Sequence, residues 1–401
     1  MSERFEREIE SIMSARTGRD CVFVPSGRFG IYLAFRLLLS PGERILMSPL
    51  EDDAVFFGAL AAGLRPVMAP TSIEDGNMQL DAVADSTWAR LGAVMTGNTY
   101  GFPDRVFDAG ARCKEFGIPL IEDAAHALET GLDGRPVGSF GTLSVFSLSK
   151  HIAGRGGVVS LGDGIRRSDL IRLRDELMLP TPIARKLVGA VRTAGRTTLH
   201  ALHARRLVDR ALRELRPVEQ RPWRIPLRED ELARALATGP NGFLDSWMNT
   251  GYADYRMRQR SSLLRRTVQH LRHLDRDREQ RIAGVLRLRE LDSAAPAVRE
   301  DPPLPLLRVP LLVEDRDAVA LELVRRRINV YFLYAPPLDD YAGEFVDASP
   351  KPDAARWWAA HVLPIHPREA GRVLELLASG EVRMPAAAPP TGAAVSERVG
   401  S

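Results

Sequence analysis

Short apolar runs alternate with longer amphipathic segments through residues 23–161 of this 401-residue chain. Apolar runs bounded by glycine or proline are typical of buried strands, and apolar residues three or four apart are typical of helices that cover a sheet. The predicted strands are residues 44–48, 66–69, 92–96, 118–122, 142–147 and 157–161, and the predicted helices are residues 28–39, 53–62 and 105–116. This alternation predicts an α/β domain with a mostly parallel sheet covered by helices on both faces.

The chain beyond this domain divides by composition. The predicted parts are a large α/β domain at 1–164, a basic helical segment with a linker at 165–226, a helix followed by a small α/β domain at 227–384, and a disordered tail rich in Ala, Pro and Gly at 385–401. The elements predicted within the third part are a long helix at 254–274, strands at 306–312 and 328–333, and a helix at 316–327. No internal repeat is visible.

Charge and composition narrow the function classes. Basic and acidic residues nearly balance, 55 against 52, and the formal net charge is +3. Nearly all the basic residues are arginines, which we attribute to genome composition, so a nucleic-acid partner is not expected. No apolar run is long enough to span a membrane, and the charged N-terminus lacks an apolar signal segment. We therefore expect a cytoplasmic protein.

Cysteine and histidine usage argues against metal or disulfide chemistry. Cys21 and Cys113 are too few for a disulfide framework or a cysteine zinc site, and we expect both to be buried as small apolar residues. The eight histidines are scattered, without carboxylates at ligand spacing. We expect no metal site.

The strongest chemical signal is a lysine that directly follows an apolar strand. The chain has only four lysines, and Lys150 comes after the run that ends at Ser147, with Ser149 beside it and glycines at 154, 156 and 157. Serine hydroxyls and exposed backbone amides suit a phosphate, and a lysine amine can form a Schiff base with a carbonyl. The turn therefore indicates a ligand that carries both groups.

Two upstream motifs fit the same kind of ligand. Residues Ser26, Gly27 and Arg28 open a predicted helix, whose free amides and dipole offer a second phosphate-binding element. Asp123 and His126 follow the strand at 118–122, where an aspartate could hold a protonated pyridine nitrogen, as a pyridoxal phosphate site requires. Each motif alone is weak, and their order and spacing carry the inference.

With these motifs the sequence resembles the DegT/DnrJ/EryC1/StrS family of pyridoxal-phosphate-dependent aminotransferases, which have the fold-type-I architecture. The resemblance covers most of the chain. The matching motifs are Ser26-Gly27 before a helix, Ala62-Gly63 with Pro66, Tyr100-Gly101 with Pro103, and residues 122–126, 138–141, 146–150, 156–159, 316–328, 334–337 and 363–367.

The resemblance implies a role for each site residue. Lys150 would form the Schiff base with pyridoxal phosphate and move a proton, Asp123 would pair with the pyridinium nitrogen, and His126 would lie near the ring. The residues implied to hold the phosphate are Ser26, Gly27, Arg28 and Ser147. Ser149 would replace or join Ser147 in this role. The implied reaction transfers an amino group from a donor such as glutamate to a keto-sugar or related keto substrate, in secondary-metabolite or glycan biosynthesis. A homodimer is also implied.

Three departures from the family keep alternatives open. The stretch 50–53 is acidic where the family has an aromatic residue over the ring, the loop before Lys150 is short, and the usual Arg/Asn substrate motif is missing. Some relatives are sugar dehydratases with a histidine at the lysine position, and His151 is adjacent to Lys150. A non-catalytic homologue that binds a partner through basic residues 183–216 is the third hypothesis. No motif specifies the keto substrate or the amino donor.

Overall fold

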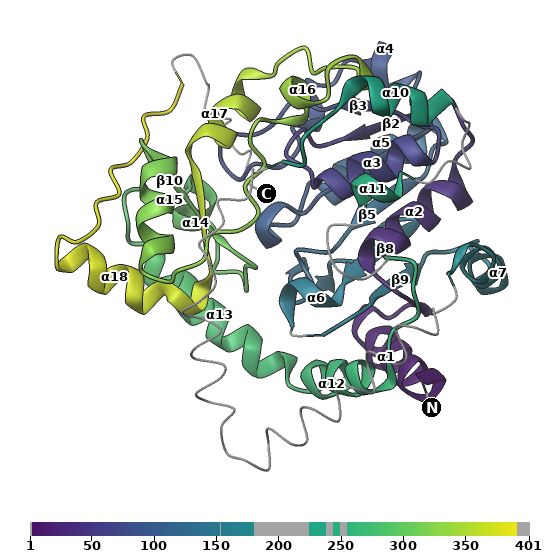
Figure 1. Ribbon diagram of the computed structural model, residues 1–401, viewed down its shortest axis with the longest axis horizontal. Helices are drawn as coiled ribbons and strands as arrows, with labels where there is room; N and C mark the ends of the chain where they lie inside the picture. The colour runs from purple at the N-terminus through teal and green to yellow at the C-terminus, as the bar shows by residue number, and fades with distance from the viewer. Residues whose placement is uncertain (1, 153, 180–223, 238–243, 249–254, 391–401) are drawn as a thin grey trace.

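A computed structural model describes residues 2–152, 154–179, 224–237, 244–248 and 255–390 (Figure 1). Within these residues, seven strands form one sheet in the order β1-β9-β8-β5-β4-β2-β3. The strands are β1 (Cys21–Val24), β2 (Arg44–Met47), β3 (Arg65–Met68), β4 (Ala93–Thr96), β5 (Leu120–Asp123), β8 (Leu143–Ser147) and β9 (Gly157–Leu161). The pairings of β9 with β1 and with β8 are antiparallel and the other four are parallel, so the mostly parallel sheet is confirmed.

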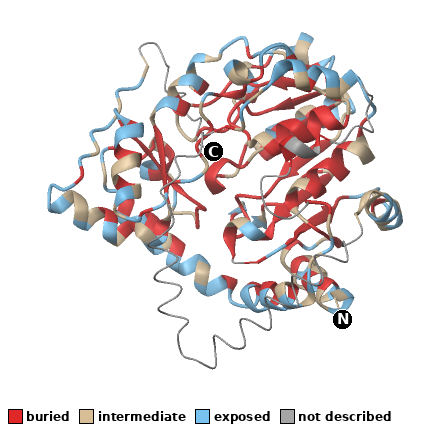
Figure 2. Cartoon of the chain, viewed as in Figure 1, coloured by how far each residue is buried: buried red, intermediate tan, exposed pale blue. Residues whose placement is uncertain are grey.

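Helices cover both faces of this sheet because side chains alternate along each strand. On β2, Ile45 and Met47 face a core shared with α2 and α3, whereas Leu46 faces a second core that includes Cys113 of α5. Figure 2 shows the strands and α3 as almost wholly buried. The elements that follow or cover the strands are α1 (Ser2–Thr17), α2 (Gly27–Leu38), α3 (Asp53–Ala61), η1 (Leu80–Ala82), α4 (Asp85–Trp88), η2 (Thr99–Gly101), α5 (Val106–Phe116), α6 (Leu148–His151), α7 (Arg167–Leu177), α10 (Glu229–Ala237), α11 (Asp245–Met248) and the ribbon β6 (Gly131–Leu132) with β7 (Arg135–Pro136).

A smaller α/β part is built around an antiparallel pair of strands with its own apolar core. Its elements are α13 (Leu274–Leu288), α14 (Pro296–Glu300), β10 (Val309–Leu312), α15 (Arg316–Arg325), α16 (Leu338–Tyr341), η3 (Gly343–Phe345), α17 (Asp353–His361), β11 (Val362–Ile365), η4 (Pro367–Glu369) and α18 (Ala370–Ala378). Helix α12 (Ser261–Leu271) packs on α1, and α13 continues from it to η4 and α18. The pair α12–α13 therefore joins the two parts along one side of the molecule (Figure 1).

The structure corrects three predictions in the second half of the chain. The helix predicted at 254–274 begins only at Ser261, because the preceding residues run along the start of α2: the Gln259 side chain donates to the Pro25 carbonyl (2.9 Å). The strand predicted at 328–333 is not a strand, and β10 pairs with β11 instead. There the backbone turns through positive φ at Arg327 and Phe332.

The third correction concerns the tail predicted to be disordered from residue 385. Its first residues are fixed, since the Ala387 amide donates to the Leu312 carbonyl (3.0 Å) and the Glu314 amide donates to the Pro385 carbonyl. Residues 391–401 lie outside the described residues. So does most of the predicted basic helical segment and linker at 165–226, of which residues 165–179, with α7, and 224–226 are described. Both cysteines are buried, as expected.

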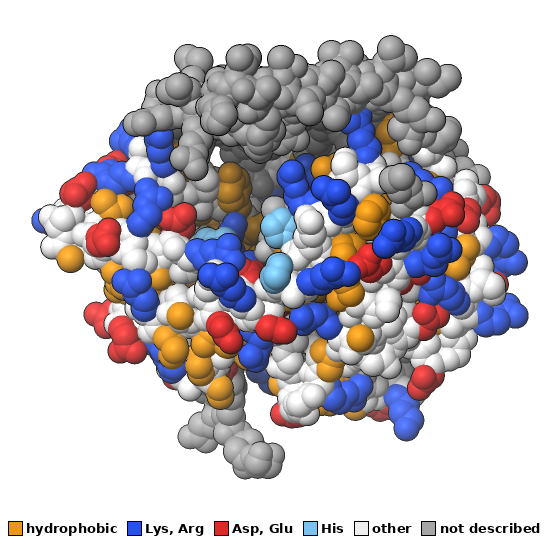
Figure 3. Space-filling model, turned by 90° about the horizontal axis from the view of Figure 1, so that it is seen from below, with side chains coloured by type: hydrophobic (Ala, Val, Ile, Leu, Met, Phe, Trp, Pro, Cys, Tyr) orange, Lys and Arg blue, Asp and Glu red, His pale blue; other side chains and the backbone are white. Residues whose placement is uncertain are grey.

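Basic side chains gather on the face seen from below the sheet (Figure 3). Arg265, Arg266, Arg272, Arg276 and Arg278 are exposed along α12 and α13, with fewer acidic residues between them. In the part of the chain that the structure describes, no helix has the length and apolar character needed to cross a membrane.

Candidate functional site

The predicted phosphate-binding element is the start of α2, which follows the buried strand β1. Ser26 caps this helix: its Oγ accepts a hydrogen bond from the Phe29 amide (3.2 Å) and donates one to the Tyr255 carbonyl (2.8 Å). Arg28 donates to the Met248 carbonyl. The cap orients the first turn of α2 with its free N–H groups at the carboxyl edge of the sheet, where an anion is favoured.

The serine turn comes to the same place from β8. A Cβ built on Gly27 would lie 2.9 Å from the Ser147 Cβ, so only glycine lets the helix start approach the end of β8 this closely. The Ser147 and Ser149 hydroxyls lie 3.3 Å apart. The structure thus brings together two pairs of residues, Ser26 with Gly27 and Ser147 with Ser149, that the sequence separates by more than a hundred positions.

Lys150 follows within α6, and its amine meets groups from two other strand ends. Its Nζ lies 3.0 Å from His126 Nε2 and 3.7 Å from Asp52 Oδ2. The Lys150 side chain is 20% exposed, so the amine is sheltered but reachable. Asp52 caps α3 by accepting from the Ala54 amide (2.9 Å), which fixes its carboxylate beside the amine.

The carboxyl groups around the Lys150 amine differ in the direction in which their pKa values are shifted. Burial raises the pKa of Asp123 to about 6, against the opposing effect of Lys150. Burial also raises the pKa of Glu51 well above its usual value. Burial acts in the same direction on Asp52, but Lys150, the Ala54 amide and nearby arginines outweigh it, so the pKa of Asp52 is lowered. At neutral pH, the Asp52 carboxyl is therefore ionised where it faces the Lys150 amine.

His126 is held as a neutral imidazole. Burial, with Lys150 nearby, lowers the pKa of His126 well below its usual value. Its Nδ1 accepts a hydrogen bond from the Tyr100 amide (3.3 Å). We therefore assign the proton of the neutral ring to Nε2, the nitrogen that faces the Lys150 amine.

Comparison with known proteins finds a family whose profile covers most residues of this site. The profile of the DegT/DnrJ/EryC1/StrS aminotransferase family matches residues 1–184. The matched residues, somewhat less than half of the chain, are therefore similar to that family.

Two curated relatives match the same region. A GDP-perosamine synthase from Vibrio cholerae is 28% identical over 178 residues, 43% of this chain and 48% of the relative. A dTDP-4-dehydro-2,3,6-trideoxy-D-glucose 4-aminotransferase from Saccharopolyspora spinosa is 30% identical over 146 residues, 35% of this chain and 38% of the relative. The chain thus aligns with less than half the length of these relatives.

The fold extends further than the sequence match. The crystal structure of a DegT DnrJ EryC1 StrS aminotransferase from Brucella abortus superposes with a TM-score of 0.60 and 16% identity, over 94% of this chain and 89% of that one. The expected fold-type-I architecture is therefore confirmed.

The register at the lysine turn is important, because Lys150 and His151 were both candidates for one position. Lys150 is the residue whose side chain reaches Asp52 and His126. The His151 side chain has other partners: its Nε2 accepts from the Leu128 amide (3.3 Å), and burial lowers its pKa well below the usual value.

Sequence reasoning missed one side of the site, which comes from the smaller part. The Phe332 ring lies 5.0 Å from the His126 ring and 5.3 Å from the Lys150 Nζ, and the Tyr334 hydroxyl lies 3.4 Å from His126 Nε2. Tyr334 belonged to a matching motif, but Phe332 fell in the predicted strand at 328–333. An apolar run gave no signal of this role. Tyr255 also lies beside this site, where its carbonyl accepts from the Ser26 hydroxyl.

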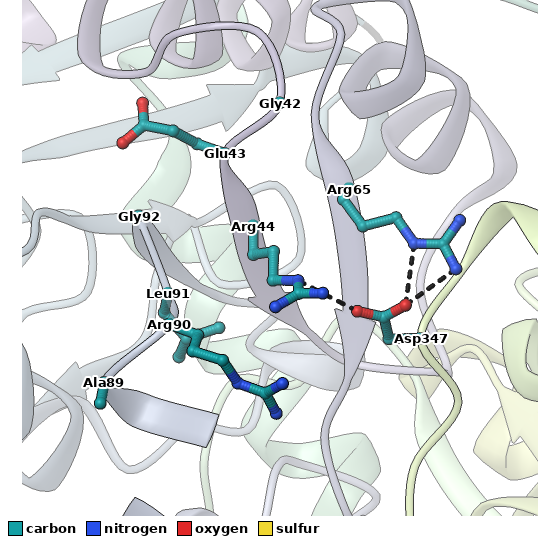
Figure 4. A pocket seen from close by; sticks show the side chains of 9 residues that line it. All are labelled: Gly42, Glu43, Arg44, Arg65, Ala89, Arg90, Leu91, Gly92 and Asp347. Atoms are coloured by element: carbon teal, nitrogen blue, oxygen red, sulfur yellow. Dashed lines mark hydrogen bonds and ion pairs between the residues drawn. The ribbon is translucent and has the colours of Figure 1, made fainter. Parts of the chain in front are cut away.

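A cavity of about 660 Å³ lies elsewhere, at the opposite edge of the sheet (Figure 4). It is lined by Arg44 at the start of β2, Arg65 at the start of β3, and Arg90. Asp347 forms ion pairs with both Arg44 (3.3 Å) and Arg65 (2.8 Å), so these arginines tie the segment after η3 to the sheet. None of the predicted site residues lines it.

Proposed function

We propose that this protein is a pyridoxal-phosphate-dependent aminotransferase that transfers an amino group from an amino-acid donor such as glutamate to a keto group on a nucleotide-linked sugar. The observation that carries the proposal is the Lys150 amine, which lies between His126 and Asp52 and next to an anion-binding helix start. The sugar acceptor is supported by the two curated relatives, whose names specify GDP- and dTDP-linked sugars.

The residues present fit pyridoxal phosphate. Gly27 and Ser147 form a close-packed cradle that any larger residue at 27 would fill, and it opens at a helix N-terminus. One amine and one buried strand-end carboxyl, Asp123, complete the set of groups that the cofactor needs. When bound, pyridoxal phosphate supplies a conjugated ring that accepts the electron pair released at a substrate carbon. Ser26, Gly27, Arg28, Ser147 and Ser149 would hold its phosphate.

The chain's own residues provide the proton handling. The Nε2–H of neutral His126 can donate to the unprotonated Lys150 amine, the form that attacks a carbonyl. When the amine holds a proton instead, the Asp52 carboxylate at 3.7 Å stabilises the ammonium. Asp123, fixed by the Ala125 amide (2.8 Å), would hold a proton on the pyridine nitrogen.

Lysine at this position supports an aminotransferase over a dehydratase, since the dehydratases of this family carry histidine there. We also propose a homodimer and a cytoplasmic location. Sedimentation of the purified protein tests the dimer, and fractionation of the producing cells tests the location.

The deciding experiment is a visible absorption spectrum of the protein with pyridoxal phosphate, before and after glutamate. We expect a band that borohydride traps on the peptide containing Lys150, and a shift of the band with glutamate. Lys150→Ala should abolish the trapped adduct and the turnover, whereas the matched change Lys114→Ala, at an exposed lysine of α5, should leave both intact. Turnover by Lys150→Ala would refute the proposed role, and a wild-type protein that takes up no pyridoxal phosphate would favour the non-catalytic alternative.

A further inference from the structure

Phe332 lies in the segment between α15 and α16, yet its ring reaches the site on the large sheet. The ring meets His126 edge to face, with centroids 5.0 Å apart and planes at 63°. Lys150 Nζ lies 5.3 Å from the ring centroid, and the buried Arg308 guanidinium also lies 5.3 Å from it. One half-buried aromatic ring therefore contacts the imidazole and two cations, rather than packing only among apolar side chains.

The backbone at Phe332 is held in a costly conformation. Its φ is +67°, in the left-handed region that favours glycine and that bulky side chains rarely adopt. The buried Tyr100 hydroxyl donates to the Phe332 carbonyl (2.8 Å), which fixes this turn from the large sheet. A strained aromatic residue fixed in this way points to a requirement at the site.

We propose that Phe332 is a positioning residue for this site: its ring shields the Lys150 amine from water and holds the His126 imidazole in the orientation that faces that amine. The attraction between a ring face and a cation, and the edge-to-face contact with His126, supply the energy. The smaller part of the chain thereby completes a site whose other groups lie on the large sheet. The proposal rests on the proposed function only where it concerns pyridoxal phosphate.

The first test needs no cofactor. Amine acylation by an N-hydroxysuccinimide ester, followed by mass spectrometry, reports the reactivity of Lys150, while exposed Lys114 and Lys351 serve as internal controls. Phe332→Gly removes the ring but suits the positive φ, so we expect a stable fold with faster acylation of Lys150 alone. Phe332→Tyr keeps an aromatic ring, so its Lys150 should be acylated at the wild-type rate. Tyr331→Leu changes the neighbouring aromatic, which is 54% exposed, and should have no effect.

The second test measures the dissociation constant of pyridoxal phosphate for the same variants. Loss of the ring contacts should weaken binding in Phe332→Gly on the order of tenfold, the equivalent of roughly 1.4 kcal/mol. Phe332→Tyr and Tyr331→Leu should bind as the wild type does.

The outcomes separate this proposal from the proposed function. Unchanged Lys150 acylation, or unchanged cofactor affinity, in a folded Phe332→Gly protein would overturn the role of Phe332 and leave the aminotransferase proposal standing. If no variant, the wild type included, binds pyridoxal phosphate while Lys150 acylation still depends on the ring, the proposed function fails and the positioning role stands. If Phe332→Gly does not fold, Phe332→Leu takes its place. Faster acylation of Lys150 in that variant would then support the role of Phe332, and an unchanged rate would overturn it.

Discussion

Individual buried carboxyl groups near the site make stability depend on pH. Asp104, which is 2% exposed, accepts hydrogen bonds from the Gly97 amide (3.2 Å) and the Arg105 amide (2.9 Å). Burial nevertheless raises the pKa of Asp104 to about 7. The folded protein thus holds an extra proton between the ordinary aspartate pKa and about 7, so this residue's contribution to stability falls as pH rises through that window.

We expect Asp104→Asn to remove this dependence. The variant loses one of two acceptor oxygens, so it should be less stable than the wild type at pH 5, and the difference should shrink towards pH 8 as the wild-type carboxyl ionises. Urea unfolding at pH 5 and at pH 8 measures this difference in the free energy of unfolding. The control Asp108→Asn, at an exposed position on α5, should follow the wild type. A difference between Asp104→Asn and wild type that does not change with pH would contradict the argument.

At the scale of elements, one glycine sets how closely α13 packs. A Cβ on Gly284 would lie 2.1 Å from the Pro367 carbonyl oxygen, a backbone atom of η4 that cannot move freely. By contrast, a Cβ on Gly110 in α5 would meet nothing within 4 Å. Both glycines are in helix interiors, so they differ mainly in the room that each has for an added methyl group.

This contrast predicts opposite effects of the same substitution. Gly284→Ala should destabilise the protein by about 1–3 kcal/mol through overpacking. Gly110→Ala should stabilise it by roughly 0.5–1 kcal/mol, because alanine is the better helix former. Chemical denaturation of the two variants and the wild type measures these changes in the free energy of unfolding. Equal effects of one sign would mean that α13 can shift away from η4 without cost.

Six of the seven strands of the large sheet, all but β1, were predictable to within a residue or two because their periodicity is local. The strand ends at Asp123 and Ser147 follow from apolar runs bounded by turn residues. The smaller part was predicted less well. The run at 328–333 has the composition of a strand, but the Tyr100 hydroxyl bond and the positive φ of Phe332 redirect it to the site. Such contacts join residues more than two hundred positions apart, and no local pattern encodes them.

Across the whole molecule, Arg281 of α13 joins the two parts from a buried position. Its guanidinium donates to the His151 carbonyl (3.0 Å) on one side and to the Leu306 carbonyl (3.2 Å) on the other. It also pairs with Asp277 (3.0 Å) and lies 3.9 Å from buried Glu129. Burial raises the pKa of Glu129 to about 7, and Arg281 opposes this rise.

Removal of the Arg281 cation should weaken the contact between the two parts of the chain and lower the free energy of unfolding. Arg281→Met leaves Glu129 without its nearby cation and the His151 and Leu306 carbonyls without this donor. Breaking a buried pair in this way costs about 3–5 kcal/mol. Urea unfolding should show this loss, and adding Glu129→Gln should recover part of it. Arg278→Met, at an exposed position of the same helix, is the control and should stay within about 0.5 kcal/mol of wild type. A wild-type midpoint for Arg281→Met would show that the two parts are held together elsewhere.

The strand order also sets when the site can form as the chain folds. Strand β1 is an edge strand whose partner in the sheet is β9, with Cys21 opposite Ser160. Helix α2 follows β1 directly, so the start of α2 reaches its place beside Ser147 only after residues 157–161 exist to receive β1. The loop that closes at this step spans more than a hundred residues and carries the entropy of that length. The first residues of the site to be synthesised are thus among the last to be fixed, and a chain that ended before β9 would leave β1 without its partner.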